Sequence, residues 1–287
     1  MPEPPIAPRQ LLVGCDFSSS PSRKKPIVMA SGWLHSPNQC VVLERLERLE
    51  SLDAFTQWLS DRQKGNWVGA FDFPFGLPRE LVVQLGWPQS WLALITHYAG
   101  LERSQIRTLF AAFCDARPVG GKFAHRSTDG PADSSPSMKW VNPPVAFMLH
   151  AGVPRLLQAG VTVVGLHTPP NDGSGSFRVA LEGYPGLLAK EVIGRTPYKS
   201  DNRAKQTTEK LLARKDMITR LEQGNTRLSL RLKTSHALRD ILTADGSGDS
   251  LDALLCLMQA GWAARQGAPL YGLPSDMDTL EGWIVSA

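Results

Sequence analysis

Hydrophobic and polar positions along the first fifty residues alternate in blocks that predict strands. Three apolar runs, at residues 10–16, 25–34 and 39–47, are separated by short polar segments rich in turn-forming residues. Strands this close together favour an antiparallel meander, because antiparallel neighbours need only short connections. The sequence therefore predicts a sheet that begins with three antiparallel strands.

The pattern changes to a helical period after residue 50. Within residues 51–63, large apolar residues recur three and four positions apart, and Ser51 stands where an N-cap is expected. A short apolar strand follows and ends at Asp72, after which Pro74 and Gly76 prevent its continuation. This strand repeats in outline the first one, which ends at Asp16.

The rest of the chain is expected to be mainly helical. The last helix is the best marked, since one stripe of large apolar residues runs along it at helical spacing. We expect a single domain, residues 1–287, with a mainly helical insertion around 79–160. In chain order, the pattern predicts helix over 79–118, a loop over 119–137, helix over 138–160, strands over 161–167 and 177–185 around a turn at 169–176, and helices over about 203–222, 227–242 and 248–267.

Composition narrows the class of protein. The chain is 42% hydrophobic and 20% charged, which is ordinary for a globular protein, and no apolar run approaches the length that spans a membrane. The N-terminal "MPEPPIAPRQ" lacks the apolar stretch of a signal peptide. The four cysteines are scattered without paired spacing, which suggests neither a zinc site nor a disulfide framework. We expect a cytoplasmic protein with no membrane partner.

Charge is unevenly distributed along the chain. The whole protein carries a net charge of +4, but residues 190–239 contain thirteen basic and five acidic residues, a net charge of +8. A concentrated basic segment can attract a polyanion such as nucleic acid, although a solvated helical face has the same composition. The segment is therefore compatible with a nucleic-acid partner.

Acidic residues stand at the ends of several predicted elements: Asp16, Asp72, Glu182, and Asp249 with Asp252. Strands of one sheet that end on the same side bring such side chains together. Clustered carboxylates repel one another and persist mainly where a divalent cation neutralises them. Mg²⁺ and Mn²⁺ prefer oxygen ligands, so the pattern indicates a metal site.

Each of these acids also has a purely structural interpretation. Asp16 and Asp72 fit turn chemistry, and Glu182 can simply be exposed at a strand end. Asp249 resembles the N-cap of the last helix. Asp252 lies at the edge of the apolar face of that helix, where a carboxylate can reach the ends of neighbouring strands. Of the two helix acids, Asp252 is the stronger candidate.

Several short motifs resemble those of a known family. "VGCD", "GAFDFPFGLP", "LEGYP", "YKSDNR" and "GDSLDALLCLMQAGWAA" occur in this order between Leu11 and about Ala264. Together they resemble the domain-of-unknown-function 429 family, whose members are predicted to be RNase H-like nucleases. One departure is the segment after the first aspartate, "FSSSPSRKKPIVMASGW", which is longer than the glycine-rich turn typical of that family.

The resemblance implies an α/β, ribonuclease H-like fold, in which a mixed five-stranded sheet opens with three antiparallel strands and is flanked by helices. Its acidic residues lie on the first strand, at the end of the fourth and on a late helix, and correspond here to Asp16, Asp72 and Asp252. Likeness to the late helix of Holliday-junction resolvases adds Asp249. The acidic strand-end position of the family corresponds to Glu182, and its basic positions to Lys199 and Arg203.

The leading hypothesis is a metal-dependent nuclease. Asp16, Asp72 and Asp252 would hold Mg²⁺ or Mn²⁺, and Glu182 or Asp249 would complete the site or act as the base. Phosphates of the nucleic acid would be contacted by Lys199, Arg203 and Lys139.

Two alternatives use the same fold. The stretch "CDFSSS" also fits, loosely, the first phosphate-binding loop of actin-like and sugar-kinase proteins, which bind ATP. A non-catalytic module that binds nucleic acid or protein would depend on the basic segment and not on the acids.

Overall fold

The core of the protein is a mixed sheet of seven strands in the order β5-β6-β4-β1-β2-β3-β7. The computed structural model describes residues 10–35, 39–170, 173 and 177–287. The N-terminal leader and most of the predicted turn at 169–176 lie outside these residues. The strands are β1 Leu11–Asp16, β2 Ile27–His35, β3 Cys40–Leu49, β4 Trp67–Phe71, β5 Thr162–Val163, β6 Arg178–Glu182 and β7 Arg231–Lys233.

The predicted meander is confirmed, whereas the predicted number of strands is wrong. β1 pairs with β2 and β2 with β3 in antiparallel register, while β4 pairs with β1, and β6 with β4, in parallel. The sheet has seven strands and not five, because β5 and β7 extend it in parallel at its two edges. β7 lies within residues 227–242, where the sequence predicts a helix. The sequence does not reveal this strand, because three residues are too few to show the alternation of a strand.

Ten α-helices surround the sheet in the part of the chain that the structure describes. Ser51 caps the first as predicted, because its Oγ accepts a hydrogen bond of 3.0 Å from the N–H of Ala54. They are α1 Leu52–Ser60, α2 Arg79–Gln84, α3 Trp91–Ala99, α4 Arg103–Asp115, α5 Asp129–Ala132, α6 Val145–Gln158, α7 Pro185–Ile193, α8 Thr208–Gln223, α9 His236–Ala244 and α10 Asp249–Gln266.

Three helix predictions need correction. The sequence pattern predicts no helix where α7 lies. This helix begins at Pro185, separated from the end of β6 by two residues, with proline at its first position. The helix expected over 138–160 with a proline start begins at Val145, directly after Pro143 and Pro144, so the start at the prolines is confirmed and residues 138–144 are not helical. In place of the helix expected over 227–242 the chain forms β7 and then α9. The stretch 79–160, predicted as a mainly helical insertion, contains α2 to α6.

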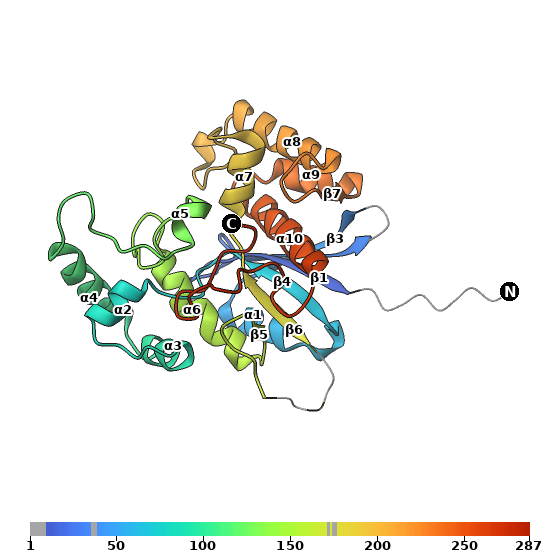
Figure 1. Cartoon of the computed structure of the whole chain (residues 1–287). Helices are drawn as coiled ribbons and strands as arrows, with labels where there is room; N and C mark the ends of the chain where they lie inside the picture. Colours follow the sequence, from blue (N-terminus) through green and yellow to red (C-terminus); the bar gives the residue numbers. More distant parts are fainter. Residues whose placement is uncertain (1–9, 36–38, 171–172, 174–176) are drawn as a thin grey trace.

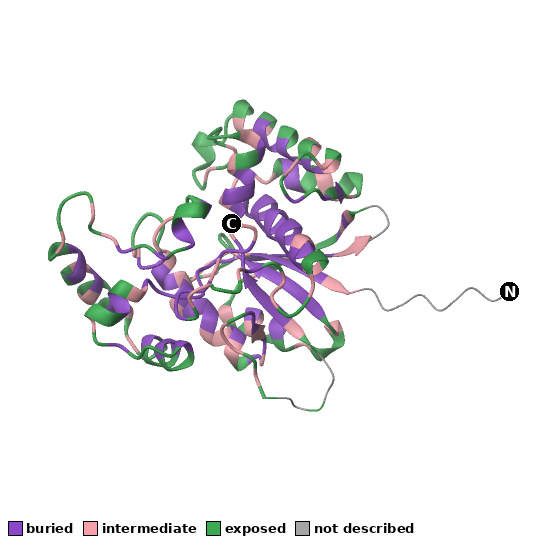
Figure 2. Ribbon diagram, in the orientation of Figure 1, coloured by how far each residue is buried: buried purple, intermediate pink, exposed green. Residues whose placement is uncertain are grey.

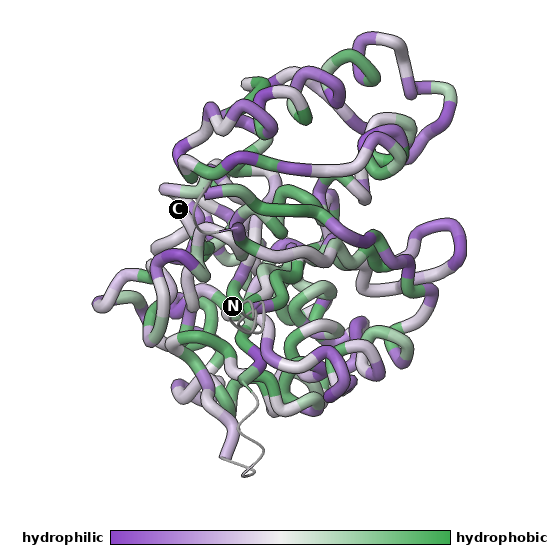
Figure 3. The backbone as a smooth tube through the Cα atoms, turned by 90° about the vertical axis from the view of Figure 1, so that its right-hand side faces the viewer, coloured by the Kyte–Doolittle hydropathy of each residue, from purple (hydrophilic) through white to green (hydrophobic). Residues whose placement is uncertain are grey.

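The helices lie on the two faces of the sheet (Figure 1). α10 crosses one face, with α7, α8 and α9 beyond it, and α1 and α6 lie on the other. Because side chains alternate along a strand, Leu12 and Val28 belong to the α10 core while Val13 and Ile27 belong to the opposite core. Figure 3 shows the hydrophilic residues concentrated on outer segments such as α8, at the top of the view.

α10 is buried on almost every side, which differs from the single apolar stripe that its sequence predicts. Fourteen of its eighteen residues are buried, and Figure 2 shows the helix enclosed between the sheet and the outer helices. The sequence does not reveal this burial because small and polar residues, among them Ala253, Cys256 and Gln259, occupy its second face. None of the helices in the described parts of the chain is both long and apolar enough to cross a membrane.

Gly14 allows α10 to approach β1 very closely. A Cβ atom at this position would lie 2.1 Å from the carbonyl oxygen of Ala253 and 2.2 Å from the amide nitrogen of Leu257. Any side chain here would therefore push the helix away from the sheet. The close approach matters for the site, because Asp252 precedes Ala253 on the helix and Asp16 lies two residues beyond Gly14 on the strand.

Candidate functional site

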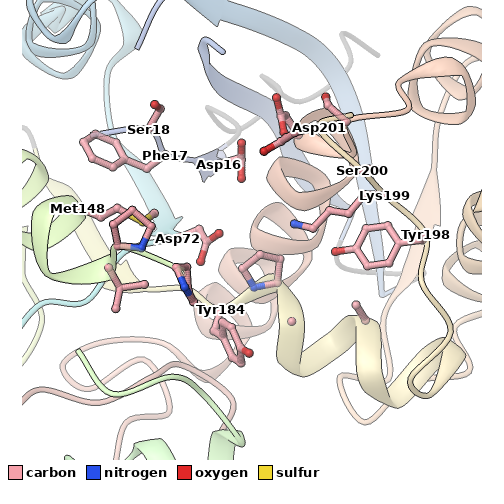
Figure 4. A pocket seen from close by; sticks show the side chains of 18 of the residues that line it. Asp16, Phe17, Ser18, Asp72, Met148, Tyr184, Tyr198, Lys199, Ser200 and Asp201 are labelled. Carbon is pink, nitrogen blue, oxygen red and sulfur yellow. The ribbon is translucent and has the colours of Figure 1, made fainter. Parts of the chain in front are cut away.

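Asp16 and Asp72 lie side by side at the ends of two parallel strands. Cys15 of β1 is in register with Phe71 of β4, and the N–H of Asp72 donates to the carbonyl oxygen of Cys15 at 2.9 Å. Alternation along the strands places both aspartates on the same face as Gly14, the α10 face. Figure 4 shows their carboxylates and the ammonium end of Lys199 directed toward the same part of a pocket.

Asp252 adds a third carboxylate from the first turn of α10. Its side chain is fully buried, and both of its oxygens have partners. Oδ1 accepts a hydrogen bond of 2.5 Å from the hydroxyl of Tyr198, and Oδ2 accepts one from Nζ of Lys199. The Lys199 side chain remains 45% exposed, so only the ammonium end is committed to this contact.

The three carboxylates act on one another electrostatically. Burial raises the pKa of Asp16 well above its usual value, and repulsion from Asp252, Asp72 and Asp249 raises it further. Burial, followed by repulsion from Asp252, raises the pKa of Asp72 to about 7. Lys199 opposes both shifts, which means that its charge lies close to all three acids. Carboxyl pKa values perturbed in this way mark a candidate functional site, and a bound cation would relieve the mutual repulsion.

Lys199 itself stays charged in this environment. Burial lowers its pKa, but attraction to Asp252, Tyr198 and Asp16 outweighs that effect, so the pKa lies well above its usual value. The lysine therefore provides a fixed positive charge within the acidic cluster.

Asp249 reaches the pocket but does not cap α10, which contradicts the structural interpretation of this residue. The N-cap is Gly248, with a φ of 83°, and Asp249 is the first helical residue. The first turn is instead held by Asp245, whose Oδ2 accepts from the N–H of Ser250 at 3.0 Å. Asp249 is mostly buried and lines the pocket beside Asp16, and burial and Asp245 raise its pKa. Asp249 therefore does not act as the N-cap that the sequence suggested.

Glu182 lies on the opposite face of the sheet. It pairs in register with Phe71, whereas Asp72 follows one residue later, so the two acidic side chains point to different faces. It is 3% exposed, so it is not an exposed strand end. Arg126 donates to both of its oxygens at 2.7 Å, and the N–H of Phe75 donates to Oε2 at 2.8 Å. Glu182 does not line the pocket that Asp16, Asp72 and Asp249 line.

The pocket is large, with a volume of about 1190 Å³, and its walls come from distant parts of the chain. Acidic side chains gather on one side, basic side chains lie around them, and an apolar wall comes mainly from the start of α6. The acidic members at the sheet and at the start of α10 are Asp16, Asp72 and Asp249; the basic ones are Lys25, Arg103, Lys190, Arg195 and Lys199; the apolar and aromatic ones include Phe17, Pro143, Pro144, Phe147, Met148 and Tyr184.

The basic residues of the pocket differ from those predicted. Lys199 lines it, but Arg203, exposed in the short helix η3 Arg203–Lys205, and Lys139, before α6, do not. No local motif in the sequence marks Lys25, Arg103 or Lys190 as site residues, and only the fold brings them to the pocket. Lys25 forms an ion pair with Asp201, Lys190 forms one with Asp133, and Arg103 donates hydrogen bonds to oxygens of Ser19 and Ser20.

The segment after Asp16 is held by the helical insertion. Arg103, at the first position of α4, donates to the carbonyl oxygen of Ser19 at 2.6 Å and to Oγ of Ser20 at 3.0 Å. The serine-rich turn therefore forms one wall of the pocket between the sheet and the insertion. This explains why a buried strand ends in an aspartate followed by serines: the turn borders a polar cavity.

The site fits a divalent cation in part. Among the described residues, no group of three or more Asp, Glu, His or Cys side chains is arranged to hold a metal ion as it stands. Lys199 and Tyr198 occupy both oxygens of Asp252. The carboxylates of Asp16 and Asp72 make no hydrogen bond or ion pair with any described residue. Two carboxylates together with water and a substrate phosphate are a common ligand set for Mg²⁺.

Comparison of the chain with protein-family models, with curated proteins and with solved structures finds no match.

Proposed function

We propose that this chain is a metal-dependent phosphodiesterase that acts on nucleic acid. The observation that carries the proposal is the convergence of Asp16 from β1, Asp72 from the end of β4 and Asp252 from α10 on one place. The resemblance to the predicted RNase H-like nucleases of the domain-of-unknown-function 429 family implies carboxylates on these same three elements. The antiparallel order of β1, β2 and β3 supports that fold.

The surroundings of each acidic residue suggest a different role for it in metal binding or proton transfer. The carboxylates of Asp16 and Asp72 make no hydrogen bond or ion pair with the residues that the structure describes, and they would hold Mg²⁺ or Mn²⁺. When bound, such an ion supplies Lewis-acid activation of a phosphodiester and of a water molecule. Asp249 lines the same pocket, and burial raises its pKa, which suits a general base that accepts a proton from the attacking water.

The rest of the pocket suits a nucleotide chain. Lys25, Lys190 and Arg103 surround the acids with positive charge that can neutralise phosphates. Across from the sheet, Phe147 and Met148 offer apolar contact area for a base or sugar. A phosphodiester placed at the carboxylates would thus have partners for its charge and for its flanking groups.

Calorimetric titration with Mn²⁺ tests the metal site without requiring knowledge of the substrate. We expect the wild-type protein to bind Mn²⁺ and both Asp16→Asn and Asp72→Asn to lose measurable binding. Asp133→Asn is the matched control, because Asp133 lines the same pocket but is paired with Lys190 at 2.7 Å. Mn²⁺-dependent cleavage of mixed single- and double-stranded DNA and RNA should follow the same order. Equal Mn²⁺ binding by all four proteins would overturn the assignment.

One observation favours a second candidate, a nucleic-acid-binding module without catalysis. Lys199 and Tyr198 already satisfy Asp252, so the cluster is partly neutralised without a metal. In that case a labelled oligonucleotide would bind equally well to the wild type and to Asp72→Asn, with or without Mn²⁺. Substitution of the basic residues of the pocket would still weaken binding.

A further inference from the structure

The ammonium group of Lys199 lies where a carboxylate cluster would otherwise bind a cation. We propose that Lys199 replaces a second divalent cation, so that the site binds a single ion at Asp16 and Asp72. The inference rests on the proposed function and specifies how its metal site is built. Two-metal sites that hydrolyse phosphodiesters place their ions about 4 Å apart, close enough to share ligands. Here the ammonium group of Lys199 occupies one of the two cation positions, the one on Asp252.

Contacts on both sides fix Lys199 in this position. Its backbone is held because the N–H of Ser200 donates to the carbonyl oxygen of Gly246 at 3.0 Å. Arg214 donates to the carbonyl oxygen of Tyr198 at 2.7 Å. The aliphatic stem of Lys199 rests on Gly248, where an added Cβ would lie 2.6 Å from the Cβ of the lysine. The residue is therefore part of a built site and not a loose surface lysine.

The partners of Asp252 leave no place on it for a metal ion. Tyr198 donates to Oδ1 at 2.5 Å and Lys199 to Oδ2, and the carboxylate is fully buried, so no face of it is open to solvent. Nζ of Lys199 also lies 5.5 Å from the centre of the Tyr198 ring, which adds a cation–π contact. A divalent ion on Asp252 would have to displace both hydrogen bonds and would face the ammonium charge.

This arrangement leaves Lys199 able to bind the substrate. An ammonium group has three N–H donors, and one of them is used by Asp252. Lys199 lines the pocket, so the other donors can bind the non-bridging oxygens of a phosphate held at Asp16 and Asp72. A fixed lysine thus supplies the charge that a second metal ion would supply.

Counting bound ions tests this assignment. Mn²⁺ is added to the protein without substrate, and free Mn²⁺ is followed by its electron paramagnetic resonance signal. We expect one bound ion per wild-type chain and two per Lys199→Met chain, with the first ion bound about tenfold more tightly because a nearby positive charge is gone. Lys190→Met is the matched control: it removes a lysine from the same pocket that pairs with Asp133, and it should bind one ion.

The outcomes separate this inference from the function on which it rests. Two ions on the wild type, or one ion on both the wild type and Lys199→Met, would overturn the role of Lys199 and leave the proposed function standing. No ion on the wild type would overturn both. If Lys199→Met does not fold, Lys199→Ala removes both the charge and the hydrogen bond to Asp252 and keeps the Cβ atom that lies against Gly248. It should bind a second ion, and a single ion would count against the proposal.

Discussion

Arg126 and Glu182, 56 positions apart in the chain, form two hydrogen bonds of 2.7 Å in the interior of the protein. Asp129 joins them, accepting from the same guanidinium at 3.0 Å and 3.2 Å. The guanidinium also donates to the carbonyl oxygen of Glu281 at 3.1 Å. One arginine of the segment predicted as a loop over 119–137 thereby ties together the insertion, β6 and the C-terminal segment.

Removing this arginine should strongly destabilise the fold. Arg126→Met leaves the buried carboxylates of Glu182 and Asp129 without their charge partner, and breaking a buried ion pair from one side costs about 3–5 kcal/mol. We expect the free energy of unfolding in urea to fall by about that amount. Arg220→Met is the control, since Arg220 pairs with Asp216 on the exposed face of α8 and its loss should cost less than about 0.5 kcal/mol.

A loss below about 1 kcal/mol for Arg126→Met would contradict this account of the network. Glu182→Gln supplies a second readout. It should lower stability but retain Mn²⁺ binding, because Glu182 lies on the face of the sheet away from Asp16 and Asp72.

The close contact between β1 and α10 gives a second prediction. Gly14→Ala places a methyl group against the backbone of Ala253 and Leu257, at distances that only a shift of the helix can relieve. We expect a loss of at least about 3 kcal/mol, since overpacking commonly costs 1–3 kcal/mol and backbone cannot move aside as a side chain can. Chemical denaturation measures it, and insoluble protein would agree with the prediction.

Gly130→Ala is the matched control for this substitution. Gly130 lies in α5, and a Cβ atom there would meet no atom within 4 Å. Its melting temperature should stay near that of the wild type. Similar melting temperatures for the two variants would show that Gly14 is not needed for the contact with α10.

The local parts of the fold could be predicted from the sequence. The meander and the cap at Ser51 depend on neighbours in the chain, and the structure confirms both. The convergence of Asp16 with Asp72 follows from two short strands that each end in an aspartate, and here parallel pairing brings these ends together. The spacing of apolar residues and the residue types at the ends of the elements are sufficient to predict these features.

The rest of the site depends on contacts that have no local pattern. The side of the sheet that Glu182 faces is set by register, and a difference of one residue between Phe71 and Asp72 reverses it. The pairing of Lys199 with Asp252 joins residues 53 positions apart. Arg126 stands in a polar stretch that resembles a surface loop, and only the tertiary structure shows that it is 3% exposed. Such features require the three-dimensional fold.

The pKa of Asp72 makes stability depend on pH in a defined direction. In the folded protein the pKa is about 7, against 3.8 for an ordinary aspartate, so between these values the folded state binds more protons than the unfolded state. Stability therefore falls as pH rises through this window. Asp72→Asn removes the effect, and its free energy of unfolding should rise relative to wild type by about 2 kcal/mol between about pH 5 and pH 8.

Denaturation by urea at several pH values, with a chelator present, measures this difference. The expected difference of about 2 kcal/mol follows from a pKa shift of one unit being worth about 1.4 kcal/mol. We take less than the full value of the shift, because the side chain of Asp72 is partly open to the pocket and solvent screens its charge. Asp133→Asn is the control: the hydrogen bond and ion pair with Lys190 lower the pKa of Asp133, so this group is ionised in both the folded and the unfolded state from about pH 5 to pH 8, and the difference from wild type should stay constant there. A constant difference between Asp72→Asn and wild type across the whole range would mean that Asp72 ionises normally. It would then not be held in a cluster of repelling carboxylates, and the attraction of the site for a cation would lose its electrostatic basis.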